Sequence, residues 1–218
     1  MKKILSKYGH GLFALYLFIY LPWFFYLEGK TDVAYHEIHI FLDDIIPFWY
    51  GFIIPYIIWF FYVVVSFIFL FFKEEQGKFI QFGILLTGGM TIAMMICTFY
   101  PNCVNLRPET IHADNLLANI VNGLYTIDTS TNVFPSVHAY NSIVVCVALE
   151  RNAYFKKHNK FRFLNILLCV LICLSTVFLK QHSVLDVLGA IALYIILGLI
   201  VYLPKWKIFD RKNIVIHD

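Results

Sequence analysis

The sequence predicts an all-α integral membrane protein built from six transmembrane helices, and its composition and uncharged runs support this prediction. Hydrophobic residues make up 60% of the 218 residues, whereas a soluble domain contains about 45–50%. Charged residues make up 14% of the chain, against about 25% in an average soluble domain. Such a chain cannot cover a globule with polar side chains, so a soluble enzyme and a disordered protein are both excluded. The length allows a single membrane domain over residues 1–218.

Six apolar runs predict the spans, because a helix needs about 20 apolar residues to cross a hydrocarbon core of about 30 Å. The runs cover residues 8–27, 45–72, 79–100, 136–149, 163–179 and 187–203. The fourth run is short and contains His138, Asn141 and Ser142. The first run is too long for the apolar region of a signal peptide and lacks a small-residue cleavage site, so we expect it to form a helix of the bundle.

The distribution of Lys and Arg residues predicts which way the helices face. Six spans place both termini on one side of the membrane, and all but three of the 17 Lys and Arg residues fall on that side. Cytoplasmic loops carry an excess of Lys and Arg, so we expect both termini in the cytoplasm. The basic loop over residues 151–162 is interpreted as the flank of a span beside anionic lipid, and no nucleic-acid partner is expected.

The opposite, outer side carries few cations and many carboxylates. Its three Lys and Arg residues are Lys30, Arg107 and Lys180. The first outer loop contains the acidic residues Glu28, Asp32, Glu37, Asp43 and Asp44. The sign of the charge therefore changes from one side of the predicted bundle to the other.

The long outer segment over residues 101–135 contains a pattern typical of an amphipathic helix. Its apolar residues share one helical face: Leu116, Leu117, Ile120, Val121 and Leu124. The polar residues on the opposite face are Asp114, Asn115, Asn119 and Asn122. We expect a short helix that lies in the outer interface of the membrane.

The cysteines indicate neither a disulfide framework nor a metal site. There are five of them, an odd number, at positions 97, 103, 146, 169 and 173. No Cys-x-x-Cys pair and no Cys/His cluster with metal-ligand spacing occurs in the sequence. We therefore expect neither a disulfide framework nor a zinc site. No cofactor is expected for this protein.

Polar residues gather in three short segments on the predicted outer side, residues 105–108, 134–138 and 180–186. Each has an ordinary interpretation: an Arg-Pro pair in a loop, a serine that caps a helix, and a histidine at the end of a span. Asp186 is harder to explain in this way, because a carboxylate within an apolar helix costs about 2.5 kcal/mol or more at the membrane centre. His182 lies four residues earlier on the same helical face and can donate a ring N–H to this carboxylate.

Together the three segments contain the groups needed for phosphoryl transfer. A histidine oriented by a carboxylate is an activated nucleophile or base, because the carboxylate fixes its tautomer. His138 opens a second helix behind Pro135 and Ser136, and the free N–H groups at a helix start bind phosphate oxygens. Arg107 can add bidentate contacts to the same phosphate. This combination points to a mechanism through phosphohistidine.

At these residues the sequence resembles the superfamily of type 2 phosphatidic acid phosphatases and vanadium haloperoxidases. The motifs of that family are Lys-x6-Arg-Pro, Pro-Ser-x-His and Ser-Arg-x5-His-x3-Asp. Arg107-Pro108 matches the end of the first motif, and residues 135–138 match the second motif completely. The resemblance covers residues 100–186 and agrees with the six-helix layout.

The third motif matches at Ser175, His182 and Asp186 with the correct spacing. Two cationic positions of the family differ in this chain. Tyr100 stands at the Lys of the first motif, and Thr176 stands at the Arg of the third. Two positive charges that bind phosphate in the family are therefore missing.

The resemblance implies a role for each matching residue. His182 attacks phosphorus while Asp186 orients it, and His138 first protonates the leaving alkoxide and then activates water. The predicted phosphate-binding groups are Arg107, Ser136, Val137, Asn102, Asn105 and Lys180. No metal is implied.

The implied protein is a metal-independent lipid phosphatase of the phosphatidic acid phosphatase type, located in the plasma membrane with its active site on the extracytoplasmic face. It hydrolyses a phosphate monoester or pyrophosphate of a lipid. Phosphatidic acid, an isoprenyl pyrophosphate and phosphatidylglycerol phosphate all stay open as substrates.

Two other functions compete with this one. A headgroup transferase of the sphingolipid-synthase kind keeps both histidines and the aspartate while its cationic positions differ, and it yields a new lipid in place of free phosphate. A proton-coupled transporter uses intramembrane His and Asp residues as a relay. A transporter predicts facing polar residues in both halves of several spans, whereas the sequence gathers them at the outer ends.

Overall fold

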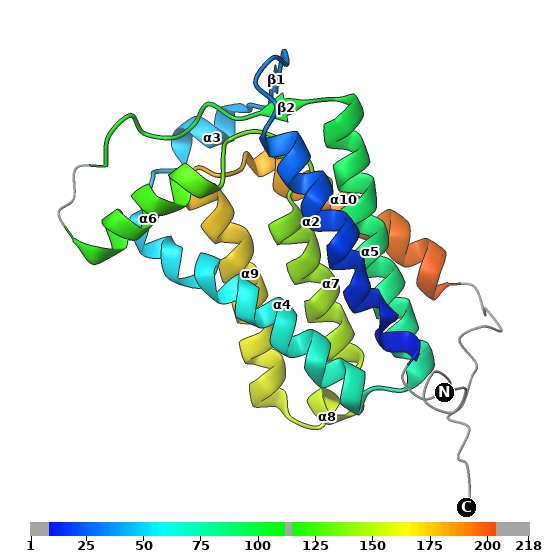
Figure 1. Cartoon of the computed structure of the whole chain (residues 1–218). Coiled ribbons are helices and arrows are strands. Elements are labelled where there is room, and N and C mark those ends of the chain that lie inside the picture. The colour runs from blue at the N-terminus through cyan, green and yellow to red at the C-terminus, as the bar shows by residue number, and fades with distance from the viewer. Residues whose placement is uncertain (1–8, 112–114, 204–218) are drawn as a thin grey trace, which may run out of the picture.

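The protein consists mainly of long helices in the computed structural model, which describes residues 9–111 and 115–203 (Figure 1). The first half of the chain contains η1 (Gly9–Tyr16), α2 (Leu17–Glu28), β1 (His36–Glu37), α3 (Phe41–Ile45), η2 (Tyr50–Phe52), α4 (Ile53–Lys73) and α5 (Gln76–Phe99). The second half contains β2 (Asn102–Cys103), α6 (Leu116–Ile127), α7 (Val137–Arg151), α8 (Ala153–Lys156), α9 (Asn159–Phe178) and α10 (Val184–Tyr202). The described chain is thus all-α, apart from β1 and β2, which pair in parallel with His36 opposite Asn102.

Five helical segments are long and apolar enough to cross a membrane: Gly11–Glu28, Tyr50–Lys73, Gln76–Phe99, Asn159–Phe178 and Val184–Tyr202. They correspond to five of the predicted spans and indicate a multi-pass membrane protein. The remaining predicted span corresponds to α7, which has 15 residues and is therefore about 22 Å long at 1.5 Å per residue. This is less than a hydrocarbon core of about 30 Å, so the sixth span remains a prediction.

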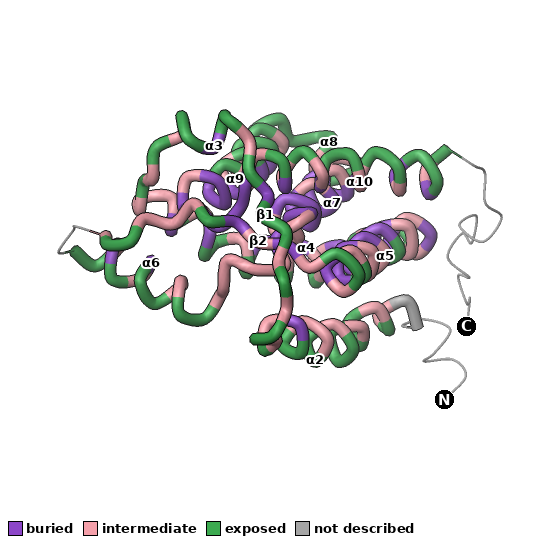
Figure 2. The backbone as a smooth tube through the Cα atoms, turned by 90° about the horizontal axis from the view of Figure 1, so that it is seen from above, coloured by how far each residue is buried: buried purple, intermediate pink, exposed green. Residues whose placement is uncertain are grey.

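Helix α7 lies at the centre of the bundle, in contact with α4, α5, α9 and α10. Figure 2 shows the buried residues gathered on α5 and α7, whereas α2 and α6 lie at the periphery. The Tyr140 hydroxyl of α7 donates to the carbonyl oxygen of Leu85 in α5 at 2.7 Å. Gly89 permits this approach, because a Cβ at that position would lie 1.9 Å from the Tyr140 ring. The polar residues of α7, such as Ser142, therefore face other helices rather than lipid.

The helices around α7 expose large apolar side chains on their outer faces. Phe18 in α2, Phe61 in α4 and Ile196 in α10 are each more than half exposed. A surface of this kind is unfavourable in water, whereas lipid tails accept it at no cost. The exposed apolar faces therefore support the membrane assignment independently of helix length.

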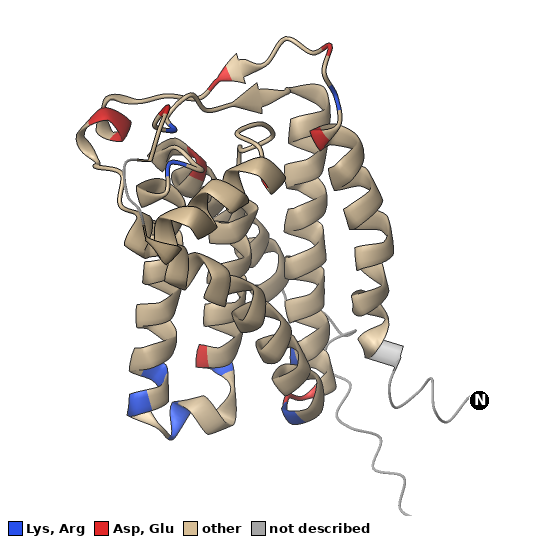
Figure 3. Cartoon of the chain, turned by 60° about the vertical axis from the view of Figure 1, so that its left-hand side comes forward, with Lys and Arg blue, Asp and Glu red and all other residues tan. Residues whose placement is uncertain are grey.

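Charged residues separate toward the two ends of the bundle. Figure 3 shows most Lys and Arg residues at the end where α4 joins α5 and where α7 leads through α8 into α9. Most Asp and Glu residues lie at the other end, which carries α3 and the strands β1 and β2. This separation agrees with the pattern in the sequence. Which end is cytoplasmic remains a prediction, and both termini lie outside the described residues.

The predicted amphipathic helix corresponds to α6. Asn115 caps it, because its side-chain oxygen accepts the N–H of Ala118 at 3.0 Å. Ala118 and Val121 are fully buried, whereas Leu116 is largely exposed and does not share their face. Asp114, predicted on the polar face, lies outside the described residues. The position of α6 in the membrane interface remains a prediction.

Candidate active site

The starts of α7 and α10 meet at the acidic end of the bundle and bring two of the polar segments together. The backbone N–H of Ser136 donates to the carbonyl oxygen of Asp186 at 3.1 Å. Each helix begins at a serine cap: the hydroxyl oxygen of Ser136 accepts the N–H of Ala139, and that of Ser183 accepts the N–H of Leu185. The backbone hydrogen bond therefore joins the two helix starts, whereas each serine cap acts within its own helix.

His182 and Asp186 form the predicted pair. The Nδ1 atom of His182 lies 3.2 Å from Oδ2 of Asp186, and the Ser183 N–H donates to the same oxygen at 2.9 Å. Asp186 is fully buried and His182 is 7% exposed. An ionised Asp186 requires the proton on Nδ1, which leaves the Nε2 lone pair of His182 free to act as a nucleophile.

His138 approaches this pair from α7. Its ring centroid lies 5.8 Å from that of His182, with the two planes at 61°. On its other sides lie the rings of Tyr56 and Trp59 from α4, at centroid distances of 4.8 and 4.2 Å. Within the described chain the His138 ring nitrogens have no hydrogen-bond partner. The sequence did not indicate this aromatic surround, because Tyr56 and Trp59 lie inside an ordinary apolar run.

Arg107 reaches the same end of the bundle from the segment before α6. Its Nη1 donates to the carbonyl oxygen of Tyr125 at 3.2 Å, and its Nη2 donates to that of Asp128 at 2.6 Å. Nη2 also donates to the side-chain oxygen of Gln181, the residue next to His182. Its Nε is buried without a partner in the described chain. Nε–H and one Nη1–H therefore remain available to a substrate.

Three residues that the sequence did not mark as functional link Arg107 to the histidines. Tyr56 donates its hydroxyl to Oδ2 of Asp128 at 2.5 Å, and Nε2 of Gln181 donates to the same oxygen at 3.2 Å. The only signals for them were the position of Gln181 beside His182 and the position of Asp128 directly after an amphipathic pattern. Burial lowers the pKa of Arg107 and the nearby Asp128 carboxylate opposes this shift.

Lys180 lies differently from the sequence prediction. Its ammonium donates to the carbonyl oxygens of Asp43 at 2.6 Å and Ile46 at 2.5 Å, both in the segment that contains α3. Burial lowers its pKa, and Asp43 and Asp44 oppose this shift. Its three N–H groups are thus directed mainly at backbone oxygens, and the structure does not bring this cation together with Arg107.

The three remaining predicted phosphate ligands lie in different settings. Val137 begins α7, so its N–H has no acceptor within the helix. Asn102 is fully buried and holds the loop before α7, because its Oδ1 accepts the N–H groups of Val133 at 2.9 Å and Phe134 at 2.8 Å. Asn105 is exposed, and no described residue hydrogen-bonds its side chain.

The two positions that lack the family cations have structural contacts. Tyr100 stacks on His36 with ring centroids 4.3 Å apart and planes 5° apart. Thr176 is fully buried and donates its hydroxyl to the carbonyl oxygen of Cys173 at 2.8 Å. Its own carbonyl oxygen accepts the N–H groups of Gln181 and His182. Thr176 therefore shapes the turn that carries the histidine.

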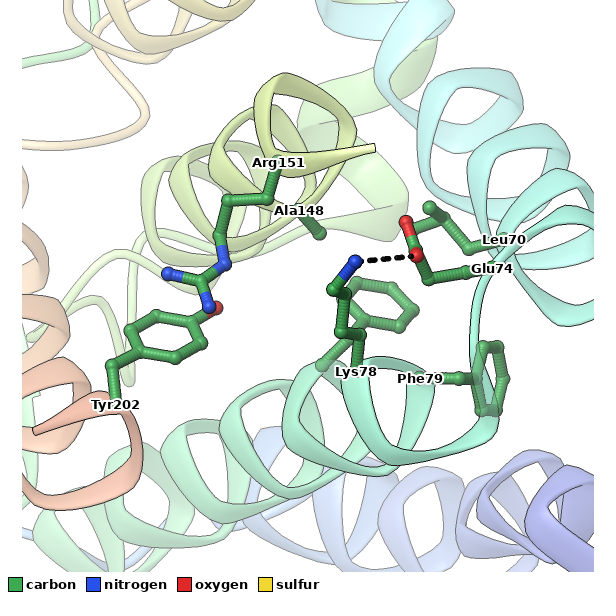
Figure 4. Close-up of a pocket in the computed structure, with 8 residues that line it drawn as sticks. Leu70, Glu74, Lys78, Phe79, Ala148, Arg151 and Tyr202 are labelled. Carbon is green, nitrogen blue, oxygen red and sulfur yellow. Dashed lines mark ion pairs between the residues drawn. The ribbon is translucent and has the colours of Figure 1, made fainter. Parts of the chain in front are cut away.

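The opposite end of the bundle contains a different polar pocket (Figure 4). There the Lys78 ammonium lies 3.6 Å from the Glu74 carboxylate, and the Arg151 guanidinium stacks over the Tyr202 ring at 4.0 Å. This pocket contains no histidine. In the part of the chain that the structure describes, no three His, Cys, Asp or Glu side chains lie close enough to hold a metal ion.

A comparison with models of known protein families matches residues 82–210 to the PAP2 superfamily. No curated protein and no solved structure matches the chain significantly. The family match covers more than half of the 218 residues and includes Arg107, His138, His182 and Asp186. The resemblance in the sequence motifs is thereby confirmed, and the chain belongs to the PAP2 superfamily.

Proposed function

We propose that this protein hydrolyses a phosphate monoester or pyrophosphate of a membrane lipid through a phosphohistidine intermediate. Membership of the PAP2 superfamily suggests a phosphatase-type activity on a phosphate ester. The observation that carries the proposal is the 3.2 Å contact between His182 Nδ1 and Asp186 Oδ2, with the second histidine ring, His138, 5.8 Å away. This arrangement provides an oriented nucleophile and a separate acid–base group in one buried site.

The reaction then proceeds in two displacements. In the first, Nε2 of His182 attacks phosphorus, the bond from phosphorus to the lipid oxygen breaks, and His138 donates a proton to that oxygen. In the second, His138 accepts a proton from water, the resulting hydroxide attacks phosphorus, the bond from phosphorus to Nε2 of His182 breaks, and phosphate leaves. Asp186 stabilises the positive charge that develops on His182 during the attack.

The phosphate oxygens would be held by groups that the described chain leaves free. These are the Nε–H and one Nη1–H of Arg107, the hydroxyl proton of Ser136 and the N–H of Val137. The start of α7 adds the positive end of a helix dipole. Such donors are directed at charge that grows in the transition state, which makes them effective in a site with little water.

The test is a panel of radiolabelled lipid phosphates presented to the purified full chain in detergent micelles. We expect release of free phosphate from at least one lipid and an acid-labile phosphoryl label on the protein during turnover. Vanadate should inhibit, because it mimics five-coordinate phosphorus, and EDTA should leave the rate unchanged. Loss of activity with EDTA, or full activity in His182→Ala, would contradict this function.

A second candidate, transfer of a phospho-headgroup to a lipid alcohol, is favoured by the two missing family cations. Tyr100 and Thr176 carry no charge, and Lys180 is bound to backbone oxygens of the α3 segment. Fewer cations suit a phosphodiester, which has one negative charge, better than a dianionic monoester. Labelled lipid with and without an acceptor alcohol separates the two: free phosphate means hydrolysis, and a new labelled lipid means transfer.

We also propose that the chain crosses the plasma membrane six times, with the site on the outer face. Cysteine labelling of intact cells with a membrane-impermeant thiol reagent tests this orientation. Glu109→Cys places a thiol at an exposed position at the site end, and Lys157→Cys places one at the basic end. Of these two introduced thiols, we expect only the one at position 109 to be labelled. The native Cys103 should label more slowly, because burial raises the pKa of its thiol.

A further inference from the structure

A buried carboxylate lies beside the catalytic turn, on a segment that the family match does not include. Asp43 belongs to α3, whereas the match begins at residue 82. Its side chain is 1% exposed. A buried carboxylate requires compensating donors, so the groups that surround it indicate what it is there to hold.

Most of these donors come from the turn that contains His182. Oδ2 of Asp43 accepts the Ser183 hydroxyl at 2.6 Å, and Oδ1 accepts the Val184 N–H at 2.8 Å. The carbonyl oxygen of Asp43 accepts the Lys180 ammonium at 2.6 Å. The one local donor is the Ile40 N–H, at 2.9 Å from Oδ2. Asp43 thus holds the chain on both sides of His182.

The geometry of the turn explains why it needs an external anchor. Lys180 has a positive φ of 54°, a conformation that non-glycine residues adopt only when their surroundings impose it. Ser183 has two carboxylate partners, since its N–H donates to Asp186 and its hydroxyl donates to Asp43. The backbone that carries His182 is therefore fixed between the Asp186 and Asp43 carboxylates.

We propose that Asp43 is a positioning residue for the nucleophilic histidine. By holding Lys180, Ser183 and Val184, it keeps Nδ1 of His182 on Asp186 and Nε2 directed at the phosphorus. The kinetic part of this inference rests on the proposed phosphohistidine function, whereas the structural part does not. It assigns a role in the active site to the loop between α2 and α4.

The kinetic test compares Asp43→Asn with Asp44→Asn in the full chain in micelles. The Asp43→Asn change keeps the size of the side chain. It replaces one carboxylate oxygen by an NH₂ group, which cannot accept the hydrogen bond that the Ser183 hydroxyl or the Val184 N–H donates to that oxygen. We expect kcat to fall about 10–100-fold, the range that a displacement of about 1 Å produces, while KM changes less than about threefold. Asp44 is the matched control, because its side chain is 59% exposed and forms its ion pair with His39 at the surface, not with the turn that contains His182. Asp44→Asn should retain the original kcat.

Vanadate separates misplacement of His182 from simple loss of folded protein. A smaller folded fraction lowers the apparent kcat and leaves the vanadate inhibition constant unchanged. A misplaced nucleophile weakens binding of this transition-state mimic by about the same factor as kcat falls. An unchanged inhibition constant in Asp43→Asn, or an unchanged kcat, would overturn the proposal.

A second measurement needs no substrate and so remains decisive if the proposed function fails. In protein labelled with ¹⁵N-histidine, the Nδ1–H of His182 is identified as the signal that His182→Ala removes. We expect this signal to persist in Asp44→Asn and to shift or disappear in Asp43→Asn. If the signal is identical in the unmodified protein and in both folded aspartate variants, Asp43 does not position the ring. Absence of phosphate release from every lipid by the unmodified chain, in contrast, contradicts only the proposed function.

Discussion

The two helix starts that form the site have the same local plan and different surroundings. Helix α7 begins after Ser136 and α10 begins after Ser183, and each serine caps its helix. Each start also carries a histidine within two residues of its cap, His138 in α7 and His182 before α10. His182 contacts the Asp186 carboxylate, whereas His138 contacts the aromatic rings of Tyr56 and Trp59 in α4.

In the proposed mechanism, this difference gives two identical side chains different roles. A carboxylate on Nδ1 fixes the tautomer of His182 and favours the cation that forms when Nε2 attacks. Aromatic rings hold the plane of His138 but leave both its nitrogens without a partner in the described chain, so it can give and take a proton. In the proposed mechanism, the environment of each histidine rather than the residue type therefore distinguishes the nucleophile from the acid–base catalyst.

The largest effect should follow from His182→Ala. Removing the attacking nitrogen prevents any covalent intermediate, so turnover should fall to the background rate for every substrate. Phosphate release and phosphoryl label on the protein are both measured. A phosphoryl label retained in this variant would show that another residue is the nucleophile and that the two histidines do not divide the roles as proposed.

Asp186→Asn should have the next largest effect, a fall in kcat of about 10⁴-fold by analogy with other carboxylate–histidine pairs. The amide can still bond to His182 but favours the wrong tautomer. Because Asp186 is fully buried, folding must be checked alongside activity, by circular dichroism of the helices in micelles. A folded Asp186→Asn protein with near-normal kcat would show that the carboxylate is only structural.

The histidines, Asp186 and Ser136 could be predicted from the sequence because their relationships are local in the chain. His182 and Asp186 are four residues apart, a spacing that places them on one helical face wherever a helix forms. Ser136 and His138 are likewise recognisable as a cap and a first-turn residue. The long apolar runs were also evident, since hydrophobicity alone predicts a membrane helix.

Contacts between distant segments could not be predicted in this way. Asp43 meets Ser183 across 140 positions of the chain, and Tyr56 meets Asp128 across 72. No periodicity or spacing links such pairs before the helices pack. Lys180 shows the same limit, because its position near His182 suggested a phosphate ligand, while the fold directs its ammonium to the α3 segment.

A second buried polar cluster lies away from the site, and no pattern in the sequence predicts it. The Tyr62 hydroxyl donates to Asn165 Oδ1 at 2.7 Å, and Asn165 Nδ2 donates to the Glu150 carboxylate at 3.0 Å. The sequence pattern predicts intramembrane polar residues at the outer ends of the spans. These side chains satisfy one another's hydrogen-bonding groups and link α4, α7 and α9. Their role is therefore structural.

His138→Ala tests the histidine at the start of α7. It leaves the nucleophile in place and removes the proton donor, whose contribution is typically 10²–10⁴-fold. An aryl phosphate barely needs that proton, so we expect this substrate to recover part of the phosphohistidine formation in His138→Ala and none in His182→Ala. Equal behaviour of the two variants toward lipid and aryl phosphates would show that the roles are not divided.

Trp59→Leu tests the aromatic surround itself and should have a smaller effect. Its ring lies 4.2 Å from that of His138, and such ring pairs contribute about 0.5–1.5 kcal/mol. We therefore expect kcat to fall by up to about tenfold, with the loss confined to substrates that need the proton. Trp23→Leu is the control, because Trp23 bonds to Thr98 between α2 and α5, away from the histidines. A similar loss in both variants would indicate general destabilisation.

The smallest effects concern the two serine caps and are measured as stability. Replacing a serine cap by alanine costs about 0.5–2 kcal/mol, so Ser136→Ala should lower the free energy of unfolding by about 1 kcal/mol. Ser183→Ala should cost more, because the Ser183 hydroxyl also donates to the buried Asp43 carboxylate at 2.6 Å, and a hydrogen bond to a charged group contributes about 1.5–3 kcal/mol. Unfolding in a denaturing-detergent titration, followed by circular dichroism, gives both values. Thr126→Ala, at an exposed position in α6, should leave stability unchanged. Equal losses for the two serines would mean that the Asp43 contact adds nothing to the α10 start, and the two helix starts would then differ only in the surroundings of their histidines.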